Sequence, residues 1–283
     1  MIGMRYITLL VFLGSVNFGF SQYATQISLW PGEVPGEETP KAKPVVQIDQ
    51  KGVIERLLVV TNPMLEVYQP PKPNGSAILI FPGGGYNRLA IKKEGYEIAE
   101  WLSKLGYTAF VLQYRVPDKQ EGALMDAQRA IRIVRSKAKA YNINPDKIGV
   151  LGFSAGGSLA ARAATRYEDQ TYPLVDEMDS LSSKPNFSVL IYPAYLDRGE
   201  NNSITPELKV TEETAPMFLF VAADDTHANS SLVMTQELRA KNVLVELHVV
   251  PQGQHGYGMR KGNPAAETWP TLAESWLKKY IIN

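Results

Sequence analysis

Ser154 stands at the centre of the sequence Gly152-Phe-Ser-Ala-Gly156, a Gly-x-Ser-x-Gly pattern that can present a serine hydroxyl as a nucleophile. The apolar residues before it predict a buried strand, and the small residues 158–165 predict a helix. A sharp turn between the two would strain the serine backbone and leave no room for side chains two residues away, which explains both glycines. The amide of Ala155 would then point to where negative charge develops on an attacked acyl oxygen. A glycine-rich packing turn without chemistry is the alternative interpretation.

A nucleophilic serine needs a general base, and the chain has three histidines. His255 lies in a glycine-rich loop after the last predicted strand, where an imidazole can reach across the strand ends. His248 falls within that strand and is interpreted as a structural residue, whereas His227 is interpreted as a residue of the rim. We therefore predict that His255 is the base. The alternative, a solvent-exposed loop histidine, would leave Ser154 without one.

A carboxylate is expected to orient the imidazole of the base. Asp224 and Asp225 follow the predicted strand at residues 217–222 in direct succession, and only one of them can point toward the imidazole. Either aspartate gives the chain order serine, aspartate, histidine, which differs from the orders in chymotrypsin and subtilisin. From the residues alone, both aspartates are candidates.

A second glycine-rich loop, Pro82-Gly-Gly-Gly-Tyr86, follows the predicted strand at residues 77–81. Successive glycines let backbone N–H groups approach a ligand without obstruction by side chains. The loop is therefore predicted to complete an oxyanion hole, the set of donors that stabilises the charged acyl oxygen. The alternative is a phosphate-binding loop, but the loop lacks the Lys-Ser/Thr pair of a P-loop and the spacing of a dinucleotide fingerprint.

Short apolar segments alternate with longer helical patterns, which predicts an α/β fold: a mostly parallel central sheet with helices on both faces. Ligands of such sheets bind beyond the carboxyl ends of the strands, and all the loops described above follow predicted strands. Two Pro-rich segments, residues 30–44 and 69–73, are expected to be loops. The expected strands cover residues 54–60, 64–68, 77–81, 108–113, 147–151, 187–192, 217–222 and 243–250, and the expected helices cover residues 94–105, 122–141, 158–165 and 265–280.

The composition favours a small neutral partner. The 283 residues include 29 basic and 29 acidic ones, which argues against a surface for nucleic acid or for an anionic membrane. The chain has no cysteine and only three scattered histidines, so we expect neither a metal site nor a cofactor. A chain of this length and pattern predicts one catalytic domain over residues 22–283.

The first 21 residues have the features of a signal peptide. Arg5 opens a short positive region, residues 7–16 are nearly all apolar, and residues 19–21 provide small residues at the cleavage spacing. The apolar run is shorter than the roughly 20 residues of a comfortable membrane span. We therefore expect a bacterial protein exported to the periplasm or secreted, without stable membrane insertion after cleavage. A retained N-terminal anchor is the alternative.

Nearly the whole chain after residue 21 resembles the α/β-hydrolases that include bacterial acetylxylan esterase-like and feruloyl esterase-like enzymes. The resemblance implies the α/β-hydrolase fold. The related hormone-sensitive-lipase-like group is a weaker match, because it has a histidine where this chain has Pro82. The motifs that carry the resemblance are Leu29-Trp-Pro-Gly32, Phe81-Pro-Gly-Gly-Gly-Tyr86, Tyr114-Arg-Val-Pro117, Asp126-Ala-Gln-Arg129, Gly152-Phe-Ser-Ala-Gly-Gly157, Ala223-Asp-Asp225 and Gly253-Gln-His-Gly256.

The resemblance also implies roles for individual residues. Gly84, Gly85 and Ala155 would supply the oxyanion hole. The catalytic aspartate of the family ends a Gly-x-x-Asp motif, which aligns with Ala222-Ala-Asp-Asp225 and selects Asp225, although alanine replaces the glycine. The implied activity is that of a serine esterase that uses a Ser-His-Asp triad and an acyl-enzyme to release acetyl or similarly small acyl groups from xylan-type or other carbohydrates.

Three aromatic residues, Trp30, Tyr86 and Tyr195, are candidates for a sugar-binding rim, with ordinary packing as the alternative. Other functions compete with the carbohydrate esterase. One is a generalist short-chain carboxylesterase, and another is a peptidase of the prolyl-oligopeptidase type, although 283 residues leave no room for its usual β-propeller. A non-catalytic binding protein on this fold would typically lack a member of the triad.

Overall fold

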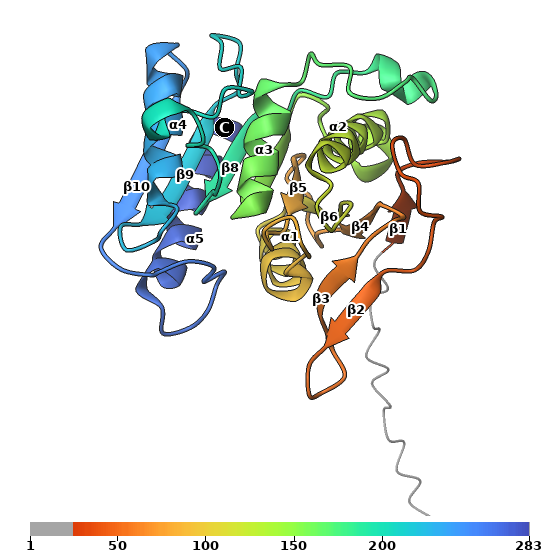
Figure 1. Cartoon of the computed structure of the whole chain (residues 1–283), viewed down its shortest axis with the longest axis horizontal. Coiled ribbons are helices and arrows are strands. Elements are labelled where there is room, and N and C mark those ends of the chain that lie inside the picture. The colour runs from red at the N-terminus through yellow and green to blue at the C-terminus, as the bar shows by residue number, and fades with distance from the viewer. Residues whose placement is uncertain (1–24, 283) are drawn as a thin grey trace, which may run out of the picture.

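The computed structural model of the protein describes residues 25–282, so the signal peptide predicted over residues 1–21 lies outside the described residues. Eight strands form one sheet in the order β1-β4-β6-β5-β7-β8-β9-β10, and β2 and β3 form a separate hairpin (Figure 1). Neighbours from β6 to β10 pair in parallel, whereas β4 is antiparallel to both β1 and β6. The strands are β1 (Thr25–Ser28), β2 (Val45–Ile48), β3 (Ile54–Val59), β4 (Met64–Tyr68), β5 (Ala77–Phe81), β6 (Thr108–Gln113), β7 (Ile148–Phe153), β8 (Phe187–Ile191), β9 (Met217–Ala222) and β10 (Val245–Val250).

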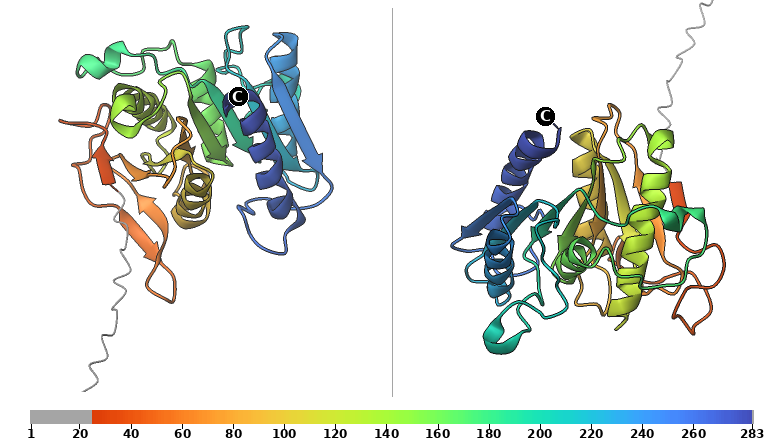
Figure 2. Two further views of the ribbon diagram at one scale, coloured as in Figure 1. Left: turned by 180° about the vertical axis from the view of Figure 1, so that it is seen from behind. Right: turned by 90° about the horizontal axis from the view of Figure 1, so that it is seen from above.

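Helices cover both faces of the sheet, which confirms the predicted architecture (Figure 2). On one face lie α2 (Gln120–Ser136), α3 (Ala155–Thr165) and α4 (Ala228–Ala240), and on the other lie α1 (Glu97–Lys104) and α5 (Pro264–Leu277). Every residue of β5 to β9 is buried, as a parallel sheet covered on both faces requires. Among the helices of residues 25–282, none has the length and apolar character needed to cross a membrane.

The predicted elements agree in type with the observed ones and differ mainly at their ends, whereas α4 has no counterpart among the predicted helices. A π-helical turn, Lys92–Tyr96, precedes α1 inside the helix predicted at residues 94–105. The helix predicted to end at residue 141 stops at Ser136 and continues as a separate 3-10 turn, Ala138–Tyr141. Strands β1 and β2 fall outside the predicted elements, because neither four-residue strand has a buried face that would give it the period of a strand.

A buried network joins three of the segments that carry the family resemblance. Trp30 donates its indole N–H to Asp126 Oδ1 over 2.9 Å, and Arg115 donates its Nε–H to Asp126 Oδ2 over 2.9 Å. Arg129, one helical turn further along α2, donates its Nε–H to the Leu29 carbonyl over 3.0 Å. All four of these side chains are buried. The network therefore fastens the N-terminal segment and the loop after β6 to α2.

We expect Asp126→Ala to lower the free energy of unfolding by about 3–5 kcal/mol, because it leaves the Arg115 guanidinium buried without its carboxylate. Urea unfolding followed by circular dichroism measures the change. Asp146→Ala, at an exposed position, is the control and should change the free energy by less than about 0.5 kcal/mol. If both variants unfolded at the same urea concentration as the parent, the network would not stabilise the fold.

Candidate active site

Ser154 occupies the turn between β7 and α3, with φ 51° and ψ −118°. Residues with a side chain rarely adopt this conformation, so the turn stores backbone strain at the serine. A Cβ atom on Gly152 would lie 2.1 Å from the Gly156 carbonyl oxygen, and a Cβ atom on Gly156 would lie 1.9 Å from the Phe81 carbonyl oxygen. These distances confirm the steric reason predicted for the two glycines.

Three predicted site residues lie in one line of hydrogen bonds. Ser154 Oγ lies 2.8 Å from His255 Nε2, and His255 Nδ1 lies 2.7 Å from Asp225 Oδ2. The Asp225 carboxylate is fully buried, whereas 30% of the His255 side chain is exposed. The sheet brings these side chains together because β7, β9 and β10 all end at the same edge. The arrangement allows the hydroxyl proton to move to Nε2 while the carboxylate holds the N–H at Nδ1.

The two adjacent aspartates have different partners. Asp225 accepts the N–H of His227 at Oδ1 over 2.8 Å and faces His255 with Oδ2. Asp224 points elsewhere, and its Oδ1 accepts the backbone N–H groups of Gly253 and Gln254 over 2.9 and 2.8 Å. Asp224 therefore fixes the loop that carries the imidazole, and Asp225 contacts the imidazole itself.

The glycine-rich loop lies directly against Ser154. A Cβ atom on Gly83 would come within 2.8 Å of Ser154 Cβ, and Gly84 and Gly85 border the same cavity as the serine. Gly84 has φ 133°, and a Cβ atom there would lie 2.1 Å from the Arg88 carbonyl oxygen. Neither the Gly84 nor the Gly85 amide donates a hydrogen bond to any residue in the range 25–282. Both N–H groups are therefore available to an oxygen atom of a bound ester.

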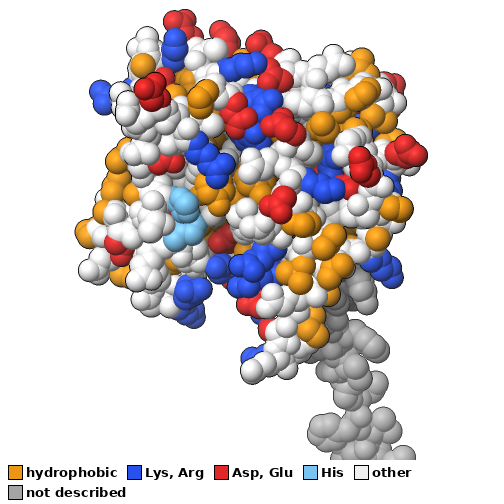
Figure 3. All heavy atoms as spheres, viewed as in Figure 1, with side chains coloured by type: hydrophobic (Ala, Val, Ile, Leu, Met, Phe, Trp, Pro, Cys, Tyr) orange, Lys and Arg blue, Asp and Glu red, His pale blue; other side chains and the backbone are white. Residues whose placement is uncertain are grey.

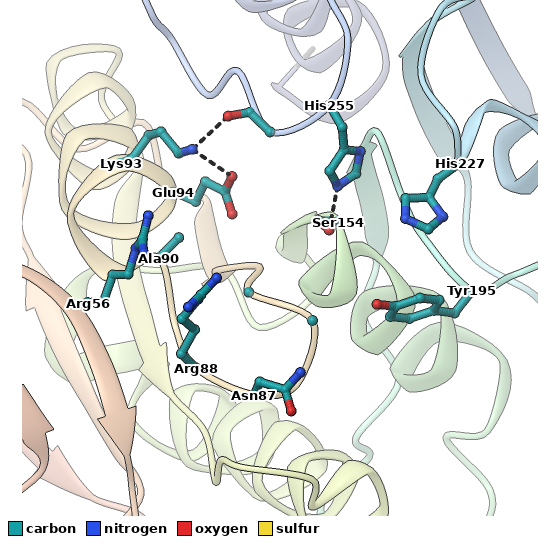
Figure 4. A pocket seen from close by; sticks show the side chains of 13 residues that line it. Arg56, Asn87, Arg88, Ala90, Lys93, Glu94, Ser154, Tyr195, His227 and His255 are labelled. Atoms are coloured by element: carbon teal, nitrogen blue, oxygen red, sulfur yellow. Dashed lines mark hydrogen bonds and ion pairs between the residues drawn. The ribbon is translucent and has the colours of Figure 1, made fainter. Parts of the chain in front are cut away.

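A cavity of about 430 Å³ opens in front of the serine (Figure 4). Tyr195 and His227 stand together on one side of it, with their ring centroids 5.4 Å apart, and the His227 ring lies 4.9 Å from the His255 ring. Burial, together with the charge that His255 carries when protonated, lowers the pKa of His227 from its usual value. His227 is therefore a neutral residue of the cavity wall near pH 7, in agreement with its predicted place on the rim.

The chain matches a protein family model and is similar in sequence to two bacterial enzymes. The BD-FAE family model matches residues 65–198. An acetylxylan esterase of Xylanibacter ruminicola is 29% identical over 217 residues, which cover 68% of this chain and 43% of that protein. Endo-1,4-beta-xylanase B of Butyrivibrio fibrisolvens is 29% identical over 63% of this chain and 32% of that protein. The chain thus spans less than half the length of these two relatives.

Solved structures extend the similarity to nearly the whole chain. The acetyl ester-xyloside bifunctional hydrolase from Caldicellulosiruptor lactoaceticus has a TM-score of 0.75 at 32% identity, covering 92% of this chain and 98% of that one. MGS-M1, an α/β-hydrolase from a deep-sea metagenome library, has a TM-score of 0.66 at 32% identity over 78% of this chain and 93% of that one. The chain belongs to the α/β-hydrolase family. Within the family, this α/β-hydrolase is of the acetylxylan esterase-like and feruloyl esterase-like type, which confirms the predicted resemblance.

The aromatic residues predicted for the rim do not share one location. Tyr195 lines the cavity of this α/β-hydrolase, as predicted. Trp30 and Tyr86 are each 1% exposed and do not line it. The Trp30 indole N–H is hydrogen-bonded to Asp126. The Tyr86 ring packs against the Tyr114 ring, with 6.2 Å between the ring centroids. The structure therefore corrects the prediction for Trp30 and Tyr86, whose side chains belong to the core.

A buried carboxylate that the sequence did not single out connects two loops of the site. Glu94 accepts the N–H of Gly83 at Oε2 over 2.9 Å and the hydroxyl of Tyr192 at Oε1 over 3.0 Å. The Tyr192 oxygen in turn accepts the N–H of Gly258 over 2.9 Å. Burial and the neighbouring Glu94 charge raise the pKa of Tyr192 well above its usual value, so its hydroxyl keeps the proton that it donates. Glu94 and Tyr192 thus tie the glycine-rich loop to the loop of His255.

His248 and Ala155 are the remaining residues that the sequence analysis discussed. His248 lies in β10, with its Nε2 atom 2.8 Å from Glu246 Oε1, as expected for a residue of the strand. Ala155 begins α3, so its amide lies at the helix N-terminus beside the serine. Within residues 25–282, no group of three or more His, Cys, Asp or Glu side chains is placed to hold a metal ion.

Proposed function

We propose that the chain is a carboxylic ester hydrolase, a serine esterase that releases acetyl or similarly small acyl groups from carbohydrate esters of the xylan type. The observation that carries the proposal is the series of contacts from Ser154 through His255 to the Asp225 carboxylate. Beside it lie the amides of Gly84 and Gly85, which have no hydrogen-bond partner within residues 25–282. The names of two similar proteins, an acetylxylan esterase and an acetyl ester-xyloside hydrolase, support acetyl esters as the substrate class.

In the acylation step, Ser154 Oγ attacks the carbonyl carbon of the ester while its proton passes to His255 Nε2. The buried Asp225 carboxylate stabilises the imidazolium that forms. The amides of Gly84 and Gly85, with that of Ala155, donate to the oxygen atom that becomes negatively charged. His255 then gives the proton to the departing alcohol as the carbon–oxygen bond breaks. The acyl group is left on Ser154.

In the deacylation step, His255 removes a proton from a water molecule, which attacks the acyl-enzyme at the same carbonyl carbon. The second tetrahedral intermediate uses the same N–H donors, because the carbonyl oxygen stays between the glycine-rich loop and α3. Its collapse returns the proton to Ser154 Oγ and releases the carboxylic acid. Neither step requires a metal ion or a cofactor.

Acetate release from three kinds of ester tests the proposal: acetylated xylan, acetylated monosaccharides and 4-nitrophenyl acetate. We expect hydrolysis of all three, with higher kcat/KM for the carbohydrate esters. A generalist short-chain esterase is the second candidate, favoured by 25% identity to an ethyl acetate hydrolase of Pseudomonas putida over 70% of this chain and 72% of that protein. Hydrolysis of simple esters alone would establish the generalist, and hydrolysis of none would refute the esterase.

We also propose that the chain is exported, on the evidence of the charged and apolar pattern of residues 1–21. Expression of the full chain in a bacterial host should yield a mature protein that begins at Gln22 in the periplasm or the medium. N-terminal sequencing and fractionation measure this. A protein that keeps its first residues and stays with the membrane would instead have a retained anchor.

Glu94→Ala is expected to lower kcat about tenfold or more with a smaller change in KM. The glycine-rich loop then loses the acceptor of its Gly83 N–H, and Tyr192, which holds the His255 loop, loses the acceptor of its hydroxyl. Steady-state kinetics on 4-nitrophenyl acetate, well below the unfolding temperature, separate kcat from KM. Glu94→Gln keeps one acceptor oxygen and should recover part of kcat. Glu97→Ala, at an exposed position one turn further along, is the control. A purely structural role would lower the unfolding temperature of Glu94→Ala and leave its kcat at the parent value.

A further inference from the structure

The cavity in front of Ser154 has a strongly basic wall, although the whole chain has equal numbers of basic and acidic residues. Arg56, Arg88 and Lys93 line this side, and we call these three residues the basic wall. Glu94 is the single carboxylate among the lining residues, and both of its oxygens already accept hydrogen bonds. Figure 3 shows basic side chains grouped beside histidine side chains on this face of the molecule.

The backbone brings the segments that carry the two arginines of the wall together. Leu57 of β3 and Leu89 of the loop after β5 form an antiparallel bridge, with N–H to carbonyl distances of 3.0 and 2.8 Å in the two directions. Both leucine side chains are buried in the core. Arg56 and Arg88 directly precede these two leucines, and both border the cavity. The hairpin of β2 and β3 thus contributes a residue to the active site.

The two arginines of the basic wall have no acidic partner in the described part of the chain. Within residues 25–282, neither Arg56 nor Arg88 forms an ion pair or a side-chain hydrogen bond. Lys93 donates to the Gly256 carbonyl over 2.6 Å and lies 3.8 Å from Glu94 Oε1. In Figure 4 the three cationic side chains lie on the opposite side of the cavity from Tyr195 and His227. Cations held together in this way repel one another, and an anion placed among them would relieve the repulsion.

We propose that the basic wall binds a carboxylate carried by the substrate, so that the preferred ester is an anionic one. A guanidinium presents N–H groups in a planar fork that matches the two oxygens of a carboxylate. The carboxylate belongs either to the acyl group, as in a dicarboxylic acid monoester, or to the sugar, as in an acetylated uronic acid. The inference rests on the proposed esterase activity, because it concerns the substrate of the same serine.

Two matched pairs of substrates test the inference and distinguish the two sources of the carboxylate. The first pair is the mono-4-nitrophenyl ester of adipic acid and the corresponding ester of adipamic acid, which differ in charge on the acyl side. The second pair is acetylated methyl glucuronoside and its uncharged glucuronamide, which differ on the alcohol side. We expect kcat/KM for the carboxylate to exceed that for the amide by about tenfold or more in one pair. That pair identifies the side that faces the basic wall.

The variants Arg56→Gln, Arg88→Gln and their combination then locate the binding site. We expect the combined variant to lower the carboxylate-to-amide ratio of kcat/KM by about tenfold, with intermediate ratios for the single variants. Arg239→Gln is the matched control, because Arg239 is exposed at the end of α4 and does not border the cavity. The control should keep the parent ratio.

Two results would overturn the inference: equal kcat/KM within both pairs, or a preference that the combined variant retains in full. In either case, hydrolysis of the amide substrates would show that the esterase itself is intact. A protein that hydrolyses no member of either pair, and no 4-nitrophenyl acetate, would instead overturn the proposed function.

Discussion

Replacing Ser154 by alanine is expected to lower kcat for ester hydrolysis by about 10³-fold or more, by analogy with deletions of the nucleophile in other triads. The substitution removes the only atom that can form the acyl-enzyme, and it leaves His255 and Asp225 hydrogen-bonded to each other. Alanine is no larger than serine, so the strained turn at φ 51° should accommodate it. The free energy of unfolding should change by less than about 1 kcal/mol.

Ser231→Ala is a matched control, because the Ser231 hydroxyl is also buried but has no hydrogen-bond partner in the described chain and lies in α4, outside the cavity lining. Its kcat/KM on 4-nitrophenyl acetate should stay within about twofold of the parent. Mass spectrometry of the protein after reaction with a phosphonate ester should show one adduct, on the peptide that contains Ser154. A folded Ser154→Ala protein with near-normal turnover would contradict the serine mechanism.

The sequence was sufficient to predict the local geometry of the candidate site. Ser154 is recognisable because a strained turn needs glycine at two fixed positions, and this steric demand is visible as spacing. His255 is recognisable because the chain has few histidines and only one stands in a loop after the last strand. The central strands are equally clear, since strands covered on both faces become short and almost wholly apolar.

The parts that were missed depend on contacts between distant residues. Glu94 follows two lysines in a helical segment, which is the usual pattern of an exposed helix surface, yet the fold buries it against Gly83 and Tyr192. Trp30 is held in the core by an aspartate 96 residues further along the chain. Neither contact leaves a periodic signal in the sequence. The resemblance aligned Asp225 with the catalytic position, but it gave no role to Asp224.

Asp225→Asn is the second large effect, and we expect it to lower kcat by roughly 10³- to 10⁴-fold, as the equivalent change does in a serine protease. The expected size follows from the two contacts of the carboxylate. Oδ1 accepts the N–H of His227, and Oδ2 accepts the proton at Nδ1 of His255. An asparagine that keeps its oxygen toward His227 turns its NH₂ group toward Nδ1. Because the NH₂ group is a donor, it favours the His255 tautomer that carries its proton on Nε2. In that tautomer Nε2 cannot accept the proton of Ser154.

Asp224 supplies the matched control, because its carboxylate accepts the N–H groups of Gly253 and Gln254 and, within residues 25–282, forms no hydrogen bond to the imidazole. Asp224→Asn keeps that acceptor oxygen, so kcat should stay within about threefold of the parent. Asp224→Ala removes that oxygen, so the loop that carries His255 is no longer held in place. We expect kcat to fall about tenfold as a result. Kinetics of the three variants on 4-nitrophenyl acetate therefore distinguish the role of Asp224, which holds the loop, from that of Asp225, which orients the imidazole. If Asp224→Asn were the crippling change and Asp225→Asn the mild one, the two aspartates would have exchanged roles, and Ser154 would remain the nucleophile.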